Sequence, residues 1–283
     1  MASTFALVPV TLDRSAGFRT YGRMRTARIV FRLWYGAILA AIWLPLDAYA
    51  AQEERFIPDC AGRVEIAHAK VARVERDGAL VLSDGRAVQL EGIRLPLEGS
   101  RALADRALTV LAGLARSGTV SFTVTPPNLS RYGQLRVQGF GGQWLQLSLL
   151  EQGLARVAIS PDRTECAPDF YEAEARGRGK GAGLWALPAY RIRAPQDLKG
   201  TAGSFQLVEG RISRIGLADG RTFLGFGGKE GFSALITDRR AFRDFDLDGL
   251  AGRKVRVRGI VQDYRGRLEI ALANPSQIEL PDN

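Results

Sequence analysis

The alternation of apolar and polar residues between positions 64 and 95 is typical of short β-strands. Three apolar runs in this stretch are separated by the pairs Asp77-Gly78 and Asp84-Gly85. Because Asp-Gly pairs favour tight hairpin turns, we predict a meander of three antiparallel strands. The strands are expected at 64–74, 79–82 and 87–93.

Residues 101–116 show a helical period instead. Apolar side chains recur there every three or four residues, and Gly118 follows the last of them, which predicts an amphipathic helix that ends near the glycine. The apolar positions are Leu103, Ala107, Val110, Leu111 and Leu114. Two closing strands are then expected at 119–124 and 134–140, and two further helices at 145–157 and 171–178.

A second series of strand patterns follows residues 191–203, whose proline and glycine content indicates a linker. Three strands, a helix and two strands, the order also found in the first series, are the order of a five-stranded OB barrel. We therefore predict an α+β fold, mainly β, with a helix-containing OB barrel in 57–190 and a second OB-like barrel in 204–281. The second series comprises strands at 205–215, 222–226, 232–236, 255–261 and 268–272, and a short helix at 241–250.

The first 50 residues have the layout of a secretory signal peptide. Several arginines precede an uncharged run at 33–46, which ends at the small residues Ala48 and Ala50. This run is shorter than the ~20 residues of a membrane span, although a retained signal anchor is the alternative. Met24 precedes the unit and is an alternative start. We expect a periplasmic or secreted protein with no stable membrane span after signal cleavage.

The chain contains two cysteines, Cys60 and Cys166. In an oxidising compartment such a pair is expected to form a disulfide, whereas two separate buried thiols are the alternative. The formal net charge of +9 includes six arginines and two aspartates in the first 50 residues. The remainder is moderately basic, which favours nucleic acid or anionic surfaces but also occurs in proteins that bind neither.

Four separated motifs carry a resemblance to one known family. They are Q-L-E-G-I-R-L-P at 89–96, R-Y-G-Q at 131–134, L-L-E-Q-G-L-A at 149–155, and A-E-A-R at 173–176 running on to G-L-W at 183–185. In this order they resemble the staphylococcal nuclease (thermonuclease) family over about residues 64–187. The resemblance implies an OB barrel with helical additions and an ancestry among metal-dependent nucleases.

Most charged positions of that family are changed in this chain. The two arginines that clamp the phosphate in the family correspond to Gln89 and Gln134, and the catalytic glutamate corresponds to Leu97. A metal-binding aspartate corresponds to Arg94, which would repel a cation. Ser130 replaces the aspartate that opens the later motif. The resemblance therefore implies a catalytically impaired protein.

The alternative is an active nuclease whose residues have moved. Asp77 corresponds to one metal ligand, although Asp77-Gly78 is also an ordinary hairpin turn. Glu98 lies next to the lost glutamate, Arg136 lies two residues from the lost clamp, and Arg94 is itself a phosphate-binding candidate. This alternative requires Ca²⁺ or another divalent cation; otherwise we predict no cofactor.

Candidate nucleic-acid-binding residues come from both halves of the chain. The family-like motif supplies Arg131 and Tyr132, while Lys254, Arg256 and Arg258 alternate along one predicted strand and share a face. A basic groove with aromatic side chains is how OB barrels bind single-stranded DNA or RNA, and Phe223, Phe226 and Phe232 are candidates for the stacking surface. The alternative is that these phenylalanines fill the barrel and the basic stripe is solvated.

The sequence thus predicts an exported, thermonuclease-like nucleic-acid-binding module. An active metal-dependent nuclease and a structural or protein-interaction module of the cell envelope are the two alternatives. The oligomeric state is left open.

Overall fold

The computed structural model describes residues 57–125, 134–218, 220–227 and 231–281. Residues Tyr49–Asn283 belong to one unit of the chain. The predicted signal region, Arg131 and Tyr132 lie outside the described residues. The predicted α+β class with mainly β structure is confirmed. Within the described residues, no helix has the length and apolar character needed to cross a membrane.

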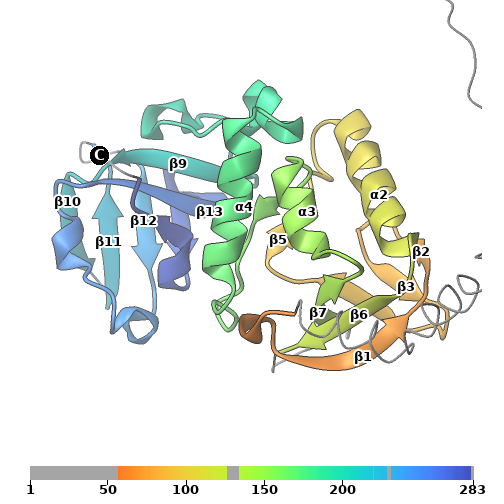
Figure 1. The fold of residues 1–283 in the computed structure, drawn as a ribbon. Helices are drawn as coiled ribbons and strands as arrows, with labels where there is room; N and C mark the ends of the chain where they lie inside the picture. Colours follow the sequence, from red (N-terminus) through yellow and green to blue (C-terminus); the bar gives the residue numbers. More distant parts are fainter. Residues whose placement is uncertain (1–56, 126–133, 219, 228–230, 282–283) are drawn as a thin grey trace, which may run out of the picture. The chain divides into compact units, whose positions relative to one another are not determined.

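The first sheet has the strand order β1-β6-β7-β4-β3-β2 (Figure 1). Its strands are β1 (Arg63–Ala69), β2 (Val71–Val74), β3 (Leu80–Leu82), β4 (Ala87–Leu90), β6 (Val120–Val124) and β7 (Leu135–Phe140). Strands β4 and β7 are parallel and the other pairs are antiparallel. Because only Lys70 separates β1 from β2, continuous chain joins the two ends of this strand order.

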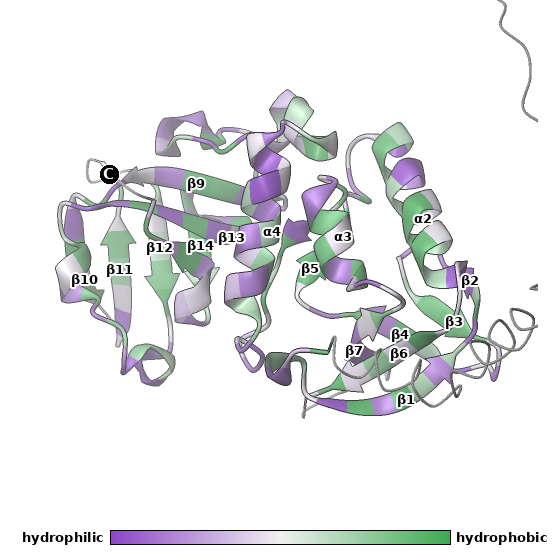
Figure 2. Ribbon diagram, viewed as in Figure 1, coloured by the Kyte–Doolittle hydropathy of each residue, from purple (hydrophilic) through white to green (hydrophobic). Residues whose placement is uncertain are grey.

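Helix α2 (Arg101–Arg116) has the predicted bounds. It begins at Ser100, whose side-chain oxygen accepts a hydrogen bond from the backbone N–H of Leu103. Such an N-cap satisfies one of the free donors of the first helical turn. The face of α2 that carries Leu103 and Leu111 is buried, and Figure 2 shows the alternation of apolar and polar residues around the helix.

The predicted helix at 145–157 is too long. Helix α3 (Leu145–Glu151) ends before Gly153, which has a φ of +62°. A Cβ atom at Gly153 would lie 2.0 Å from the carbonyl oxygen of Ala182, so glycine is required at this close approach. The chain then enters strand β8 (Arg156–Val157), which pairs with β5 (Ile93–Arg94). Helix α4 (Ala167–Gly179) is longer than predicted.

The second sheet has the strand order β10-β11-β12-β14-β13, and β9 and β15 also pair with β13. Its strands are β9 (Phe205–Arg211), β10 (Arg214–Ala218), β11 (Arg221–Gly225), β12 (Ser233–Ile236), β13 (Lys254–Tyr264), β14 (Arg267–Leu272) and β15 (Ile278–Glu279). Strands β12 and β14 are parallel. The short strand β15 was not predicted, because two residues carry no readable alternation.

The predicted helix at 241–250 is wrong. Two 3₁₀ turns, η5 (Arg239–Phe242) and η6 (Asp248–Leu250), take its place. Asp246 accepts a hydrogen bond from the backbone N–H of Gly249, and such local side-chain bonds compete with a continuous helix. The remaining 3₁₀ turns are η1 (Asp59–Ala61), η2 (Gly183–Ala186), η3 (Pro188–Tyr190), η4 (Pro195–Leu198) and η7 (Pro275–Gln277).

Each sheet has its own hydrophobic core. The first core packs Phe122, Leu111 and other apolar residues of the sheet and of α2, α3 and α4. The second core includes Phe226 and Phe232, whose ring centroids lie 5.3 Å apart, and also Leu198 from the segment predicted as a linker. Figure 2 shows apolar residues on the central strands of both sheets.

The predicted disulfide between Cys60 and Cys166 is confirmed. It joins η1 to the residue that precedes helix α4, across a sequence separation of 106 residues. A cross-link over such a long loop removes much of the conformational freedom of the unfolded chain.

We predict that removing this bond lowers the free energy of unfolding by about 2–5 kcal/mol, because the reduced chain regains that freedom. Urea unfolding of Cys60→Ser, Cys166→Ser and the double variant measures the loss. The single variants and the double variant should be equally destabilised, since each removes the same bond. A double variant twice as destabilised as either single variant would contradict a shared cross-link.

Candidate functional site

A cavity of about 530 Å³ brings together three of the predicted site residues, Asp77, Arg94 and Glu98. Asp77 lies in the turn between β2 and β3, Arg94 ends β5, and Glu98 lies in the segment that leads to α2. Gln89 and Leu97 line the same cavity, which we call the Asp77 cavity. These groups come together because β3 pairs antiparallel with β4, which brings the β2–β3 turn beside the end of β4.

The charged groups of the Asp77 cavity already have partners. The Nη2 atom of Arg94 donates a hydrogen bond to Oε1 of Glu98 at 2.7 Å. The Oδ1 atom of Asp77 accepts a hydrogen bond of 3.0 Å from the backbone N–H of Ala79, which is the bond of an Asx turn. A hard divalent cation needs about six oxygen ligands, so these residues do not fit a calcium or magnesium ion.

Arg136 does not line this cavity, although it lies opposite Gln89 in the pair of β4 and β7. Its guanidinium group contacts Asp162 at 3.1 Å and Glu91 at 3.4 Å, and it also donates to Ser160. Glu91 is buried, so this pairing compensates a charge inside the protein. The guanidinium group of Arg136 is therefore paired with carboxylates that do not line the Asp77 cavity.

The prediction that Arg258 contacts nucleic acid is wrong, because its side chain is only 1% exposed. Its Nη2 atom lies 2.9 Å from Oε2 of Glu174 in α4, and it also pairs with Glu279 of β15. Its Nη1 atom donates to the carbonyl oxygen of Val157 at 3.0 Å. The guanidinium carbon lies 4.5 Å from the ring centroid of Tyr171, so protein groups surround the cation.

The electrostatics of this cluster follow from burial and mutual pairing. Burial would lower the pKa of Arg258, but the charges of Glu174 and Glu279 raise it above its usual value. Burial would raise the pKa of Glu279, but the charge of Arg258 holds it below the ordinary value of 4.5. Burial raises the pKa of Tyr171 to about 12. All three groups therefore keep one protonation state near neutral pH.

The neighbouring members of the basic stripe are also paired. Arg256 is buried and contacts Glu209 and Glu279, while Lys254 lies 2.6 Å from Glu209 and is half-exposed. The three basic residues do share a face, as predicted, but for Arg256 and Arg258 that face packs against protein. Phe226 and Phe232 belong to the second core and are only 2% and 4% exposed, so little of either ring is available for stacking, although both line a cavity of about 620 Å³.

A second cavity, of about 170 Å³, contains a residue that the sequence did not single out. Arg156 of β8 is 7% exposed and donates a hydrogen bond of 2.9 Å to the carbonyl oxygen of Phe205. Its guanidinium carbon lies 5.0 Å from the ring centroid of Tyr190 and 4.8 Å from that of Phe205. Burial lowers the pKa of Arg156 to about 10, so the residue remains a cation. We call this cavity the Arg156 pocket.

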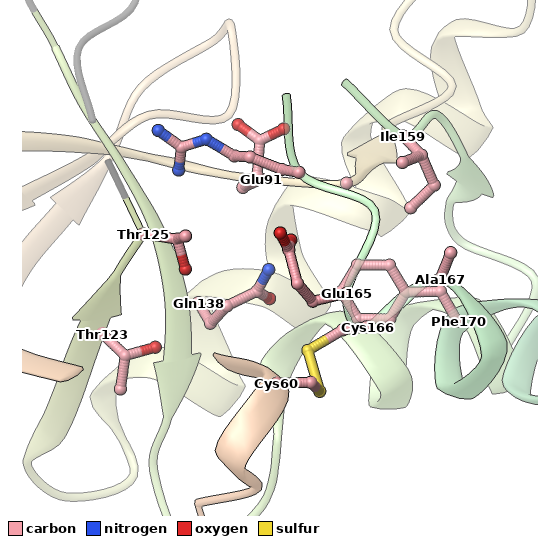
Figure 3. A pocket seen from close by; sticks show the side chains of 12 residues that line it. Cys60, Glu91, Thr123, Thr125, Gln138, Ile159, Glu165, Cys166, Ala167 and Phe170 are labelled. Carbon is pink, nitrogen blue, oxygen red and sulfur yellow. A yellow bond between two sulfur atoms is a disulfide. The ribbon is translucent and has the colours of Figure 1, made fainter. Parts of the chain in front are cut away.

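A third cavity is too small for a ligand. Figure 3 shows Glu91, Gln138 and Glu165 around it, with the disulfide on one side. Its volume of about 10 Å³ corresponds to about one water molecule. Cys60, Cys166 and Asp169 lie close enough together for a metal site, but the two sulfur atoms are bonded to each other and are not thiolate ligands.

No known protein-family model and no curated protein matches this chain. The resemblance to the thermonuclease family therefore stays a prediction.

We predict that Glu174→Ala lowers the free energy of unfolding by about 3–5 kcal/mol, because the substitution leaves Arg258 buried beside fewer negative charges. The substitution also removes the acceptor of the Val157 N–H. The control is Glu172→Ala on the same helix, where an exposed pair with Arg176 contributes at most about 1 kcal/mol. Urea unfolding compares the two variants, and equal losses would contradict the role assigned to Glu174.

The pKa of Glu279 predicts an acid-sensitive contribution to stability. Since its folded pKa lies below the unfolded value of 4.5, the stabilisation is complete above that pH and is lost as pH falls through the folded pKa. Unfolding free energy measured from neutral pH into this window should therefore decline less steeply in Glu279→Gln than in the wild type. Parallel pH profiles would contradict the pairing, and Glu172→Gln serves as the exposed control.

Proposed function

We propose that this chain is an exported, thermonuclease-like nucleic-acid-binding protein without the machinery for phosphodiester hydrolysis. The observation that carries the proposal is the state of the charges in the Asp77 cavity. Glu98 is held by Arg94 and Asp77 caps a turn, so neither carboxylate is placed to bind a metal or activate water. The arginine in this cavity favours an anionic ligand over a cation.

The proposed OB architecture is supported by the identical strand connections of the two sheets. In each sheet the first strand consists of two segments, β1 and β2 or β9 and β10. The first segment pairs with the fourth strand and the second segment with the second strand. The third and fifth strands are parallel. This arrangement is the one expected of a five-stranded Greek-key barrel, which commonly binds oligonucleotides.

Surface charge in the second half supports a polyanionic ligand. Among the described residues there, several arginines form no ion pair with a carboxylate. They are Arg214, Arg221, Arg239, Arg240, Arg253, Arg265 and Arg267. Arg265 and Arg267 both lie exposed at the β13–β14 hairpin. Contacts of such groups with phosphates supply most of the affinity of non-specific nucleic-acid binding.

Export is supported by the disulfide, because such bonds persist in oxidising compartments. The proposed location is the periplasm or the extracellular space.

An active nuclease is the second candidate, and one observation favours it. Asp77, Arg94 and Glu98 line the same cavity although they lie in different elements. A ligand that displaced Glu98 from Arg94 would leave two carboxylates in this cavity. This candidate requires cation-dependent cleavage that is lost in Asp77→Ala and in Glu98→Ala.

We predict that the purified protein binds single-stranded DNA or RNA with an affinity that falls steeply with salt, and that it cleaves neither. Fluorescence anisotropy over a salt series measures binding, and gel analysis with Ca²⁺, Mg²⁺ or chelator measures cleavage. The Arg265→Gln/Arg267→Gln variant should reduce the magnitude of the salt slope by roughly one to two. No binding near physiological salt, or binding independent of salt, would contradict the proposal.

The charge-matched control is Arg101→Gln/Arg116→Gln on the outer face of α2. It removes the same charge away from the second sheet, so the slope should stay close to that of the wild type. Cleavage that needs a divalent cation would instead support the nuclease candidate.

A further inference from the structure

The Arg156 pocket has the composition of an anion site. It is lined by residues from β5 and the segment after it, from β8, from η3, and from the start of β9. Its charged lining residues are Arg94, Arg156 and Glu98. Because Glu98 is paired with Arg94, the positive charge of Arg156 is left without a counter-charge in the pocket.

Arg156 keeps unused hydrogen-bond donors. A guanidinium group has five N–H donors, and among the described residues the only hydrogen bond of the Arg156 side chain goes to the carbonyl oxygen of Phe205. The rings of Tyr190 and Phe205 lie close to the cation, which withdraws it from bulk water. A buried cation of this kind gains more from an anionic partner than an exposed one would.

The charges around Arg156 do not occupy its hydrogen-bond donors. Burial and the like charge of Arg94 both lower the pKa of Arg156, whereas the charge of Glu174 raises it. The oxygens of Glu174, however, already accept hydrogen bonds from Arg258 and from the backbone N–H of Val157. Glu174 therefore contributes negative potential near Arg156 but accepts no hydrogen bond from it, so the donors of Arg156 stay available to an anion.

We propose that the Arg156 pocket binds a phosphate group, with Arg156 and Arg94 as its donors. Both residues line this pocket, and their guanidinium carbons lie 4.8 Å (Arg156) and 5.8 Å (Arg94) from the ring centroid of Phe205. Arginine forks match the oxygens of phosphate and bind them bidentately.

The size of the pocket limits what enters it. Its volume of about 170 Å³ exceeds the ~10–15 Å³ that one water molecule needs but lies below the ~300 Å³ at which pockets begin to enclose whole small ligands. The pocket therefore takes a free phosphate ion or the terminal phosphate of a longer chain, and not an entire nucleotide. This inference goes beyond the proposed function, since it requires no contact with bases or with a phosphodiester backbone.

Isothermal titration of the purified protein with inorganic phosphate, at constant ionic strength and with acetate as a comparison, tests the site. We expect phosphate to bind more tightly than acetate, and Arg156→Gln to weaken phosphate binding by about tenfold or more. Glu98→Gln should tighten it several-fold, because Arg94 then loses its competing carboxylate. A misfolded variant would not give such an increase. Arg101→Gln, on the exposed start of α2, is the control and should change nothing.

Two oligonucleotides that differ only in a terminal phosphate distinguish the sources of the ligand. If the phosphorylated one competes better with inorganic phosphate, the site holds a chain end; if both compete equally poorly, it holds the free ion. The proposal is overturned if wild-type protein does not bind phosphate at millimolar concentration, if acetate binds equally well, or if neither Arg156→Gln nor Glu98→Gln changes the affinity. Nucleic-acid binding by the unphosphorylated oligonucleotide is scored separately, so failure of one proposal is distinguishable from failure of the other.

Discussion

The buried ion pair between Arg258 and Glu174 is the interaction on which the rest of this region depends. It fixes the wall that the Asp77 cavity and the Arg156 pocket share at Arg94. Arg258 of β13 and Glu174 of α4 together bind both backbone groups of Val157, one through its carbonyl oxygen and the other through its N–H. Val157 and Arg156 form β8, which pairs with Ile93 and Arg94 of β5. On the other side, β13 pairs with β9, so that Ile260 lies opposite Phe205. The pair thus positions Arg156, Arg94 and Phe205 through backbone contacts.

Three arginines of this region show how the partner of an arginine decides its role. Arg258 is enclosed by carboxylates and a backbone carbonyl, which leaves it a structural group. Arg94 shares its charge with a single carboxylate that is 68% exposed, a pairing that solvent and ligands can weaken. Arg156 lies between aromatic rings and one carbonyl oxygen, with no carboxylate bonded to it in the described part of the chain. Capacity to bind an anion therefore rises from Arg258 to Arg94 to Arg156.

Local elements were predictable from the sequence because hydrophobic periodicity encodes them directly. The bounds of α2 follow from apolar spacing, and Asp-Gly pairs mark two of the turns. The strand predicted at 64–74 is divided at Lys70 into β1 and β2, and the one predicted at 87–93 is divided into β4 and β5. The alternation of Lys254, Arg256 and Arg258 correctly predicted a shared face. It did not reveal what covers that face, since Glu174 lies 84 residues away from Arg258 in the sequence. Arg156 was missed because it was assigned to the end of a helix, whereas the close approach of Gly153 to Ala182 ends the helix earlier.

The proposed ancestry gives Arg94 a further meaning. In the family that the chain resembles, this position carries an aspartate that attracts a cation, and here the sign of the charge is reversed. An arginine at this position does more than remove a metal ligand, because Arg94 also pairs with Glu98. Glu98 is the carboxylate best placed to replace the glutamate that corresponds to Leu97. The same side chain extends to the Arg156 pocket, where it adds positive potential beside a buried cation. One residue thus disfavours metal in the Asp77 cavity and favours an anion in the Arg156 pocket, so the proposed loss of cleavage and the proposed anion binding share one physical origin.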